Sequence, residues 1–235
     1  MQDNWPITTI WSFPDHGKWA THDSKYRGNW SPYVPRNLIK KYSKPKDIVL
    51  DQFVGSGTTL IEAQLLNRTS IGVDINDKAL KITRAKLKFL SSTHSKIYLR
   101  KGNAKKLEFI PNNSIDLICT HPPYANIIKY SKNIKGDSSL IHPKDFQGEL
   151  RLIATEAYRV LKPNKFCTIM IGDVRNNGKL YPLGFQLLNC FQETGFHLKE
   201  IIIKEQHNCK GTKKWANKTL SFYLLAHEYI FIFQK

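Results

Sequence analysis

DIVLDQFVGSGTTLIEAQLLN, residues 47–67, decides the fold class of this chain. Its first five residues form a short apolar run of the kind that makes a buried strand, and residues 57–67 carry apolar side chains at helical spacing. Gly55 and Gly57 lie between the two and permit a tight turn with close approach of the backbone to a ligand. This order predicts the first βα unit of a parallel sheet, with a helix N-terminus able to hold an anionic group.

The same alternation continues on both sides of this stretch. Further strands are predicted at 69–75, 96–99, 114–119, 166–173, 197–204 and 228–233, and helices at 35–42, 77–90, 143–161 and 182–194. Alternating strands and helices predict an α/β fold with a doubly wound, mostly parallel, seven-stranded sheet. No helix-sized segment separates the last two strands, so we expect the last strand to pair antiparallel.

The charge balance indicates a polyanionic partner. The 235-residue chain has 36 Lys and Arg against 19 Asp and Glu, which gives a formal net charge of +17. This excess is large for an enzyme of small metabolites, and nucleic acid is the first candidate. A generally basic, soluble surface is the plain alternative.

Cysteine usage and hydropathy exclude several other classes. The four cysteines are widely spaced without a CxxC pair, so we expect reduced core residues and no metal site or disulfide. The N-terminus does not have the pattern of a signal peptide, and no apolar run reaches membrane-spanning length. We therefore expect a cytoplasmic protein without membrane association.

Polar residues follow the first three strands of the predicted sheet and outline a ligand pocket. The Gly-rich turn after Asp51 is short and has no lysine, so it suits a carboxylate better than a pyrophosphate. Asp74 ends the next strand, where an acidic residue commonly takes ribose hydroxyls. GNA (102–104) follows the third strand and is placed to meet an adenine ring. Together they predict a site for S-adenosylmethionine (SAM), although Asp74 alone also reads as a helix cap.

THPPY, residues 120–124, ends the strand at 114–119. Two prolines cannot continue a sheet ladder, so a rigid loop must leave the strand here. Methylation of an exocyclic amine requires acceptors that hold its protons while the nitrogen lone pair leaves the ring. The His121 side chain and the fixed Pro122 carbonyl are candidate acceptors. Tyr124 offers a face for base stacking, worth ~1–3 kcal/mol and comparable to the cost of flipping a base.

DQFVGSGTT, VDI (73–75) and THPPY resemble the motifs of the amino-methylating DNA methyltransferases, which make N6-methyladenine or N4-methylcytosine. In that family the catalytic motif is usually [Asp/Asn/Ser]-Pro-Pro-[Tyr/Phe/Trp] and the first motif is often DPFxGSGTT. The similarity covers most of residues 30–235, including the order of elements. It implies a Rossmann-like class I methyltransferase fold, SAM as cofactor, and a base flipped out of double-stranded DNA.

The resemblance also implies roles for single residues. Cofactor contacts are implied for Asp51, Phe53, Gly55, Gly57, Thr58, Asp74, Asn103, Ala104 and Thr120. Catalytic roles are implied for His121, Pro122, Pro123 and Tyr124.

Two positions depart from the family pattern. Gln52 replaces a proline, which we expect to be harmless, and His121 replaces Asp, Asn or Ser. A neutral imidazole accepts a hydrogen bond and an imidazolium does not. We therefore expect activity to fall in mild acid, as the pH passes the ordinary histidine pKa of ~6.5. A structural cap on the loop is the alternative role for His121. Thr120 resembles the Thr-Ser-Pro-Pro-Tyr pattern of N4-cytosine enzymes and tilts the expected base towards cytosine, with adenine left open.

The whole chain, 1–235, is interpreted as a single methyltransferase domain. Its aromatic arm, 1–45, contains WSPYVPRNLI, which resembles the segment that closes over the cofactor methionine in the family. The basic loops 125–142 and 205–220 are the expected DNA-contacting insertions, and 172–184 is expected to wall the pocket. Candidate DNA contacts are Lys129, Lys132, Arg175, Lys210, Lys213, Lys214 and Trp215. A solvated basic face is the alternative for each loop.

Other functions stay open at the level of sequence. An RNA base methyltransferase would use the same Pro-Pro-Tyr chemistry and the same charge. A catalytically inactive DNA-binding subunit is kept open by His121, whereas a net charge of +17 does not suit a protein-glutamine methyltransferase. A homodimer and a companion restriction subunit are both compatible with the short chain.

Overall fold

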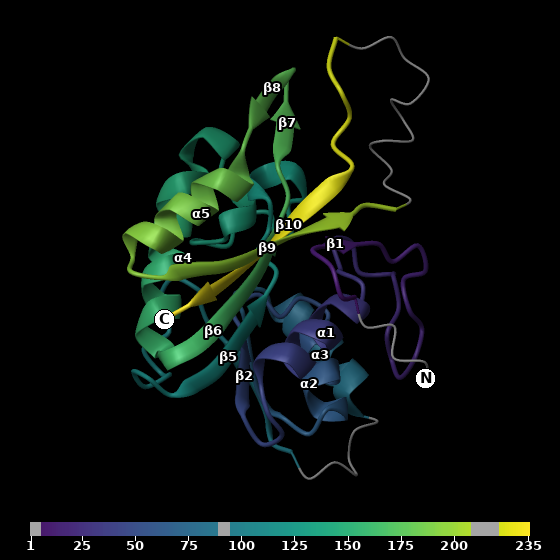
Figure 1. Cartoon of the computed structure of the whole chain (residues 1–235), viewed down its shortest axis with the longest axis vertical. Coiled ribbons are helices and arrows are strands. Elements are labelled where there is room, and N and C mark those ends of the chain that lie inside the picture. Colours follow the sequence, from purple (N-terminus) through teal and green to yellow (C-terminus); the bar gives the residue numbers. More distant parts are fainter. Residues whose placement is uncertain (1–5, 89–94, 208–220) are drawn as a thin grey trace.

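The apolar runs that follow the polar turns form the strands of one mixed β-sheet (Figure 1). The computed structural model describes residues 6–88, 95–207 and 221–235. Within these residues the sheet has eight strands in the order β1-β9-β10-β6-β5-β2-β3-β4. Their bounds are β1 Ile10–Trp11, β2 Ile48–Asp51, β3 Thr69–Asp74, β4 Ile97–Lys101, β5 Ile115–Thr120, β6 Leu161–Ile171, β9 His197–Glu205 and β10 His227–Gln234.

The direction of the strands matches the prediction. β10 runs antiparallel to both of its neighbours, β6 and β9, and every other neighbouring pair of this sheet is parallel. All seven predicted strands are present, so the predicted fold class is confirmed. The additional strand, β1, comes from the aromatic arm and pairs with β9. It has two residues, too few to show a periodic pattern in the sequence.

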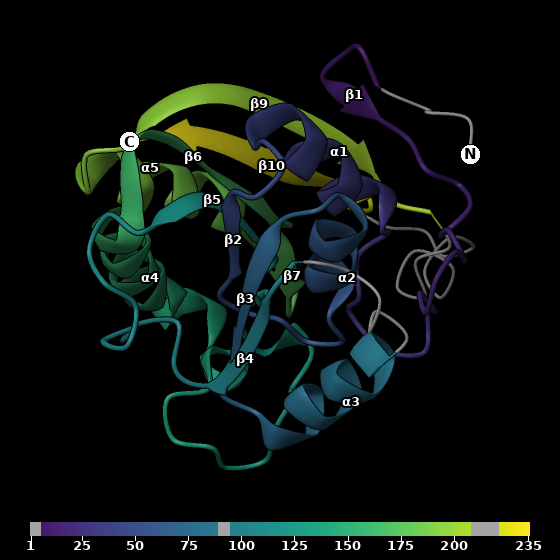
Figure 2. The same ribbon diagram turned by 90° about the horizontal axis from the view of Figure 1, so that it is seen from below.

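Helices cover both faces of the sheet (Figure 2). They are α1 Tyr33–Tyr42, α2 Thr58–Leu65, α3 Asp77–Leu87, α4 Phe146–Val160 and α5 Leu183–Glu193. α4 and α5 pack together on one face, α1 and α2 pack on the other, and α3 lies beside β3 and β4. Among the described residues, no helix is both long and apolar enough to cross a membrane.

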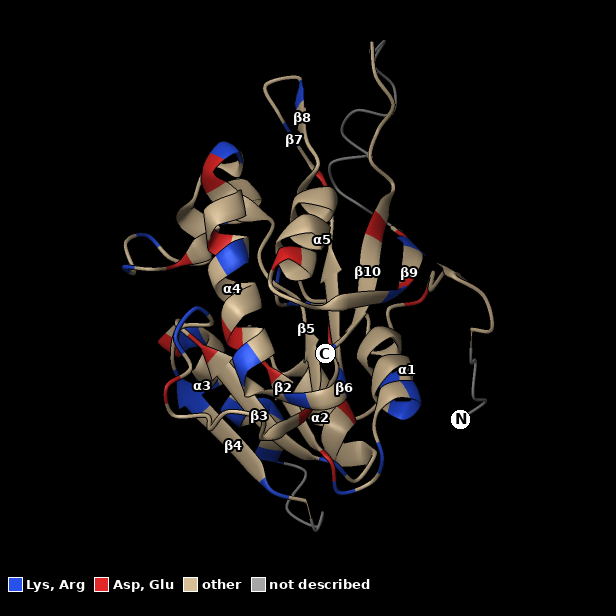
Figure 3. Ribbon diagram, turned by 60° about the vertical axis from the view of Figure 1, so that its left-hand side comes forward, with Lys and Arg blue, Asp and Glu red and all other residues tan. Residues whose placement is uncertain are grey.

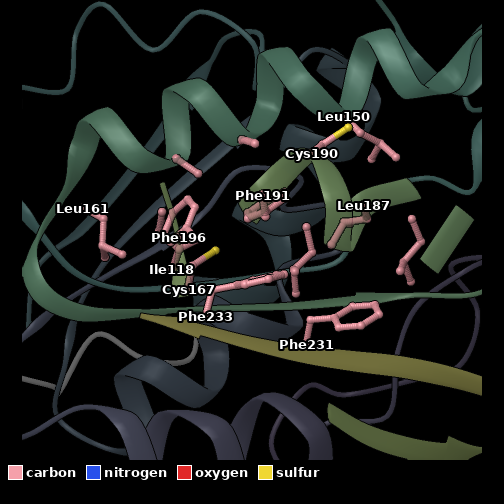
Figure 4. Packing of buried hydrophobic residues seen from close by; sticks show 14 of the residues in the cluster. Ile118, Leu150, Leu161, Cys167, Leu187, Cys190, Phe191, Phe196, Phe231 and Phe233 are labelled. Carbon is pink, nitrogen blue, oxygen red and sulfur yellow. The ribbon is translucent and has the colours of Figure 1, made fainter. Parts of the chain in front are cut away.

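The larger core fills the space between the sheet and the α4–α5 layer (Figure 4). Phe191 of α5 and Phe233 of β10 are fully buried and stack with their ring centroids 4.8 Å apart. The three described cysteines are buried free thiols. Cys209 lies outside the described residues.

One strand start and one predicted loop differ clearly from the prediction. β6 begins at Leu161, directly after α4, rather than at Phe166. The segment 172–184 forms a hairpin of β7 (Val174–Asn176) and β8 (Lys179–Tyr181). Its turn residues Asn177 and Gly178 have φ angles of 49° and 78°, the positive values that a two-residue hairpin turn requires.

The Gly-rich turn depends on one residue without a side chain. Gly57 caps the N-terminus of α2 in the left-handed conformation, with φ 86°. A Cβ at this position would also lie 2.8 Å from Cγ2 of Thr83 in α3. Gly57 therefore lets α2 start directly after the turn 52–57 that follows β2, with its N-terminal N–H groups at the carboxyl edge of the sheet.

The aromatic arm is fastened to the sheet layers by a buried carboxylate. Glu62 of α2 is fully buried and accepts hydrogen bonds from Trp19 Nε1 at 2.7 Å, His22 Nε2 at 2.7 Å and Arg36 Nη1 at 2.9 Å. Trp19 and His22 belong to the arm and Arg36 belongs to α1. One side chain thus ties the arm, α1 and α2 together.

We predict that Glu62→Gln lowers the free energy of unfolding by about 3 kcal/mol, because it removes the buried charge that accepts from one buried and two partly buried donors. Urea titration followed by circular dichroism measures this loss. Glu193→Gln is the matched control, since Glu193 forms an exposed ion pair with Arg151 and its loss should leave the unfolding midpoint almost unchanged. Equal midpoints for both variants would show that the arm is not held by Glu62.

Candidate active site

A cavity of about 930 Å³ opens at the carboxyl edge of the sheet, within the size range of small-molecule sites. Residues of the arm, the Gly-rich turn, the THPPY loop and the ends of β3, β4, β9 and β10 line it. The predicted residues that line it are Asp51, Phe53, Gly55, Asp74, Asn103, Ala104, His121, Pro122, Pro123 and Tyr124. Gly57, Thr58 and Thr120 are not among its lining residues. Thr58 and Thr120 instead donate hydrogen bonds to two residues that are, Asn29 and Asp51.

Asp51 joins the Gly-rich turn to the THPPY loop. Its buried carboxylate accepts hydrogen bonds from Thr120 Oγ1 at 2.7 Å, from the Phe53 N–H at 3.0 Å and from the Thr59 hydroxyl. Burial raises the pKa of Asp51, although these donors oppose the shift. Thr120 also accepts from the Gln52 N–H at 3.2 Å. Thr120 therefore acts as a link between two loops.

Gln52, which stands where the family usually has proline, connects the turn to the third strand end. Its Nε2 donates to the Ala104 carbonyl at 3.2 Å. Its Oε1 is buried and has no hydrogen-bond partner among the described residues, and Gln52 lines the cavity. The side chain thus supports the segment predicted to meet adenine, while its unpaired oxygen is shielded from the cavity.

Asp74 ends β3 at the wall of the cavity. It accepts the N–H groups of Gly55 at 3.0 Å and Asn76 at 2.9 Å. Its pKa is raised to about 6, mainly by burial and also by the nearby carboxylates of Asp51 and Asp137, while these two hydrogen bonds oppose the shift. Each carboxylate oxygen can accept more than one hydrogen bond, so both retain capacity for ligand hydroxyls.

The THPPY loop carries a chain of short hydrogen bonds. His121 Nε2 lies 2.7 Å from the Tyr124 hydroxyl oxygen, and this hydroxyl donates to Glu228 Oε1 at 2.7 Å. Lys204 Nζ donates to Glu228 Oε2 at 2.9 Å. Glu228 belongs to β10 and Lys204 to β9, where they are paired across the strands. Two strands therefore hold the tip of the loop that leaves a third.

The environment of these hydrogen-bonded side chains favours the neutral form of His121. Burial lowers the pKa of His121 to about 4, with Glu228 opposing the shift and Lys204 adding to it. Burial also raises the pKa of Tyr124. For Glu228, burial disfavours the charged form, but Lys204, His121 and Tyr124 together hold its pKa below the usual range. The loss of activity expected near pH 6.5 is therefore moved to lower pH, because burial lowers the pKa of His121 to about 4.

The arm packs against the THPPY loop. Trp30 stacks on His121 with ring centroids 5.3 Å apart and an interplanar angle of 23°. Tyr26 stacks on Tyr130 of the loop 125–142 at 5.8 Å and 7°, and burial raises the pKa of Tyr130 to about 12. The arm thus reaches both the THPPY loop and the predicted DNA-contacting loop.

The predicted DNA contacts are separated in the structure. Lys129 and Lys132 lie with Lys78 of α3 around a second hollow, which shares Tyr130 with the main cavity. Figure 3 shows the basic positions along α3. Arg175 lies on β7, where its guanidinium stands 4.1 Å from the ring centroid of Phe222. Lys210, Lys213, Lys214 and Trp215 lie outside the described residues.

The expectation that 172–184 walls the pocket is wrong. None of its residues lines the cavity, because β7 and β8 pair with each other as a separate hairpin that projects beyond the sheet (Figure 1).

Sequence reasoning missed Glu228 and Lys204. A signal existed, because Glu228 is an acidic residue at the start of an otherwise apolar strand. An antiparallel last strand begins at the edge where its parallel neighbours end, so the predicted topology placed this carboxylate at the same edge of the sheet as the THPPY loop, without placing the two in contact.

Comparison with known proteins places the geometry in a family. A family model described as DNA methylase matches residues 1–85 and 115–235. Type II methyltransferase M.MthZI of Methanothermobacter thermautotrophicus is 29% identical over 165 residues, covering 62% of this chain and 46% of the relative. Type II methyltransferase M2.DpnII of Streptococcus pneumoniae is 38% identical over 77 residues, 33% of this chain and 28% of the relative. This chain therefore spans less than half the length of either relative.

Other similarities extend to RNA enzymes and to the fold. A tRNA (guanine(10)-N2)-dimethyltransferase of M. thermautotrophicus is 32% identical over 101 residues, 43% of this chain and 29% of the relative. The crystal structure of TrmN from Thermus thermophilus superimposes with a TM-score of 0.62 at 18% identity, covering 90% of this chain and 51% of that one. The crystal structure of a SAM-dependent methyltransferase from Methanosarcina mazei superimposes with a TM-score of 0.57 at 18% identity, covering 84% of this chain and 96% of that one. At these identities the two structures show that the fold is that of SAM-dependent methyltransferases.

The close approach of Gly172 to Tyr124 generates a prediction. A Cβ on Gly172 would lie 2.9 Å from Tyr124 Cε2 and 3.4 Å from Glu228 Cγ, so Gly172→Ala should displace the Tyr124 ring and lower the free energy of unfolding by about 1–3 kcal/mol. Thermal unfolding and a crystal structure of the variant measure both effects.

Gly148→Ala is the control for this substitution. Gly148 lies in the first turn of α4 with open space around its Cα, so alanine there should leave stability unchanged or raise it by up to about 1 kcal/mol. A Gly172→Ala protein as stable as Gly148→Ala, with Tyr124 in place, would contradict the packing described here.

Proposed function

Because the chain belongs to the N6/N4-type DNA methylase family, we propose that it transfers a methyl group from SAM to the exocyclic amino group of a base in double-stranded DNA. The single observation that carries the proposal is that His121 and Tyr124 line the same cavity as the Gly-rich turn and Asp74. A base amino group and a nucleoside cofactor would therefore meet inside one cavity.

The residues around the cavity fit SAM. Asp74 can accept ribose hydroxyls, and the turn at Gly55 lines the cavity beside it. Asn103 and Ala104 line the side on which an adenine would lie. When bound, SAM would supply a methyl group activated by its attachment to a sulfonium.

The chain would act on the base by holding its amino group. The amino nitrogen forms a bond to the methyl carbon as the carbon–sulfur bond breaks, the electron pair stays on sulfur, and the nitrogen releases one proton. His121, neutral because burial lowers its pKa to about 4, and the Pro122 carbonyl would accept the two N–H groups. The Tyr124 ring would stack on the flipped base.

Cytosine N4 is the favoured target and adenine N6 is the alternative. The preference rests on the resemblance of Thr120 to the N4-cytosine pattern. Thr120 itself bonds to Asp51 and is fully buried, so it would act on the choice of base only through the position of the loop.

The surface around the second hollow supports duplex DNA as the substrate. Lys78, Lys129 and Lys132 gather there next to Tyr130, which also lines the main cavity. We propose that they contact phosphates on one side of a flipped base, with Arg175 and the basic residues of 205–220 as further contacts. Phosphate contacts of this kind position a duplex without specifying its sequence.

RNA is the second candidate substrate. The observation that favours it is the 32% identity over 101 residues to a protein named as a tRNA (guanine(10)-N2)-dimethyltransferase. The chemistry at an exocyclic amine would be the same, so the substrate decides between the two.

We predict that purified protein, incubated with tritium-labelled SAM, transfers label to mixed-sequence duplex DNA, and that nucleoside mass spectrometry identifies N4-methylcytosine. Tyr124→Ala should lower kcat/KM about 5- to 150-fold, the loss of one stacked base. Tyr98→Ala is the control, because Tyr98 is a half-exposed residue of β4 away from the cavity. Label found in tRNA and not in DNA would favour the RNA enzyme, and no transfer at all would favour an inactive subunit.

We also predict that SAM binding weakens about tenfold between pH 7 and pH 5. Asp74 has a pKa of about 6, and its charged, accepting form is lost as the pH falls through that value. Isothermal titration calorimetry measures the change. Asp74→Asn should bind weakly at both pH values, whereas the exposed Asp77→Asn should behave as the unchanged protein. Equal affinity of the unchanged protein at pH 7 and pH 5 would remove Asp74 from the cofactor site.

A further inference from the structure

The hydrogen-bond chain behind the THPPY loop has a direction that proton counting fixes. Glu228 is ionised, since the Lys204 ammonium donates to one of its oxygens. Its other oxygen lies 2.7 Å from the Tyr124 hydroxyl, and an ionised carboxylate only accepts. Tyr124 must therefore donate its single proton to Glu228.

The next link in the chain follows from this one. A phenol that has given its only proton to a carboxylate can act towards a third group only as an acceptor. His121 Nε2 lies 2.7 Å from the Tyr124 oxygen, so Nε2 must carry the hydrogen. A neutral imidazole has one N–H, and Nδ1 of His121 is therefore the nitrogen with a free lone pair.

The free nitrogen is available to the cavity. Nδ1 has no hydrogen-bond partner in residues 6–88, 95–207 and 221–235, and it is not one of the sealed polar atoms of the interior. The ring lines the cavity and is held by the Trp30 stack on its face.

We propose that Glu228 is a positioning residue, which acts through the Tyr124 hydroxyl to fix the Nε2–H tautomer of His121 and so leaves Nδ1 as the acceptor for the base. This inference rests on the proposed function and adds to it a residue on β10, which lies far from the THPPY loop in the sequence. Nδ1 accepts a hydrogen bond from the amino group and takes the proton that the nitrogen releases on methylation. The proton then passes from the imidazolium to solvent.

The charges around the ring suit both stages. The charged groups that face His121 are Glu228 and Lys204. Burial and Lys204 keep Nδ1 unprotonated at neutral pH against the opposing effect of Glu228, so the lone pair is present before transfer. After transfer, the imidazolium donates to Tyr124 and lies one hydrogen bond from the Glu228 carboxylate.

Glu228→Gln reverses the direction of these hydrogen bonds without changing the size of the side chain at position 228. Lys204 can only donate, so it selects the carbonyl of the new amide and turns the NH2 group towards Tyr124. The Tyr124 oxygen then accepts from this amide and donates its proton to His121 Nε2. His121 is driven into the Nδ1–H tautomer, and the acceptor is lost.

Nuclear magnetic resonance of the 15N-labelled full chain, free of cofactor and DNA, tests the tautomer directly. The His121 signals are assigned by their absence in His121→Asn. We expect the Nε2–H tautomer in the unchanged protein and in the control Glu200→Gln, whose carboxylate pairs with Lys41 on the surface. We expect the Nδ1–H tautomer in Glu228→Gln. An Nδ1–H tautomer in the unchanged protein, or no change in Glu228→Gln, overturns the proposal.

Kinetics then test the link to catalysis. Glu228→Gln should lower kcat by about 100-fold or more, as expected for loss of an acid–base group, with the Kd for SAM unchanged. Lys204→Arg, which keeps the cation, should retain the Nε2–H tautomer. Unchanged kcat in a Glu228→Gln protein with the Nδ1–H tautomer overturns the acceptor role. Failure of the unchanged protein to methylate any nucleic acid overturns the proposed function. The tautomer measurement is made on the free protein and does not depend on that outcome.

A second variant covers the case in which Glu228→Gln does not fold. Tyr124→Phe removes the hydroxyl alone, so His121 Nε2 loses its partner and both tautomers should appear in the spectrum. A pure Nε2–H tautomer in Tyr124→Phe overturns the proposal.

Discussion

The buried carboxylate of Asp51 is the contact on which the candidate site depends. It ends β2, and through Thr120, Thr59 and the Phe53 N–H it binds the end of β5, the start of α2 and the Gly-rich turn. The Gly-rich turn and the THPPY loop are consequently held in one fixed relation. This is the arrangement that a transfer reaction needs, because the donor and acceptor atoms must meet within a fraction of an ångström.

The antiparallel β10 supplies what parallel strands alone do not. Its first residues lie at the edge where β5 and β6 end, and there Glu228 takes the Tyr124 hydroxyl while Lys204 neutralises the carboxylate. A histidine in place of the usual Asp, Asn or Ser thereby keeps one defined lone pair. The Trp30 stack adds the aromatic arm to the same site, and Glu62 fastens the arm to α1 and α2.

The order of elements and most of the residues that line the cavity could be predicted from the sequence, because both depend on local patterns: apolar runs, two glycines in a turn, and acidic residues at strand ends. The contacts behind the catalytic loop could not, because Glu228 lies 104 positions from Tyr124 and no short motif joins them. The pKa of His121 could not be predicted for the same reason, because it is lowered by burial under segments that are distant in the sequence. β1 was too short to show a pattern.

The central claim is that this cavity brings the cofactor's methyl group to a base amino group held at His121 and Tyr124. A crystal structure of the protein with SAM bound tests it most directly. We expect the ribose at Asp74, the adenine beside Asn103, and the methyl group pointing into the space between His121 Nδ1 and the Tyr124 ring. A methyl group that points away from Tyr124, or that lies too far from it to reach a stacked base, would contradict the account.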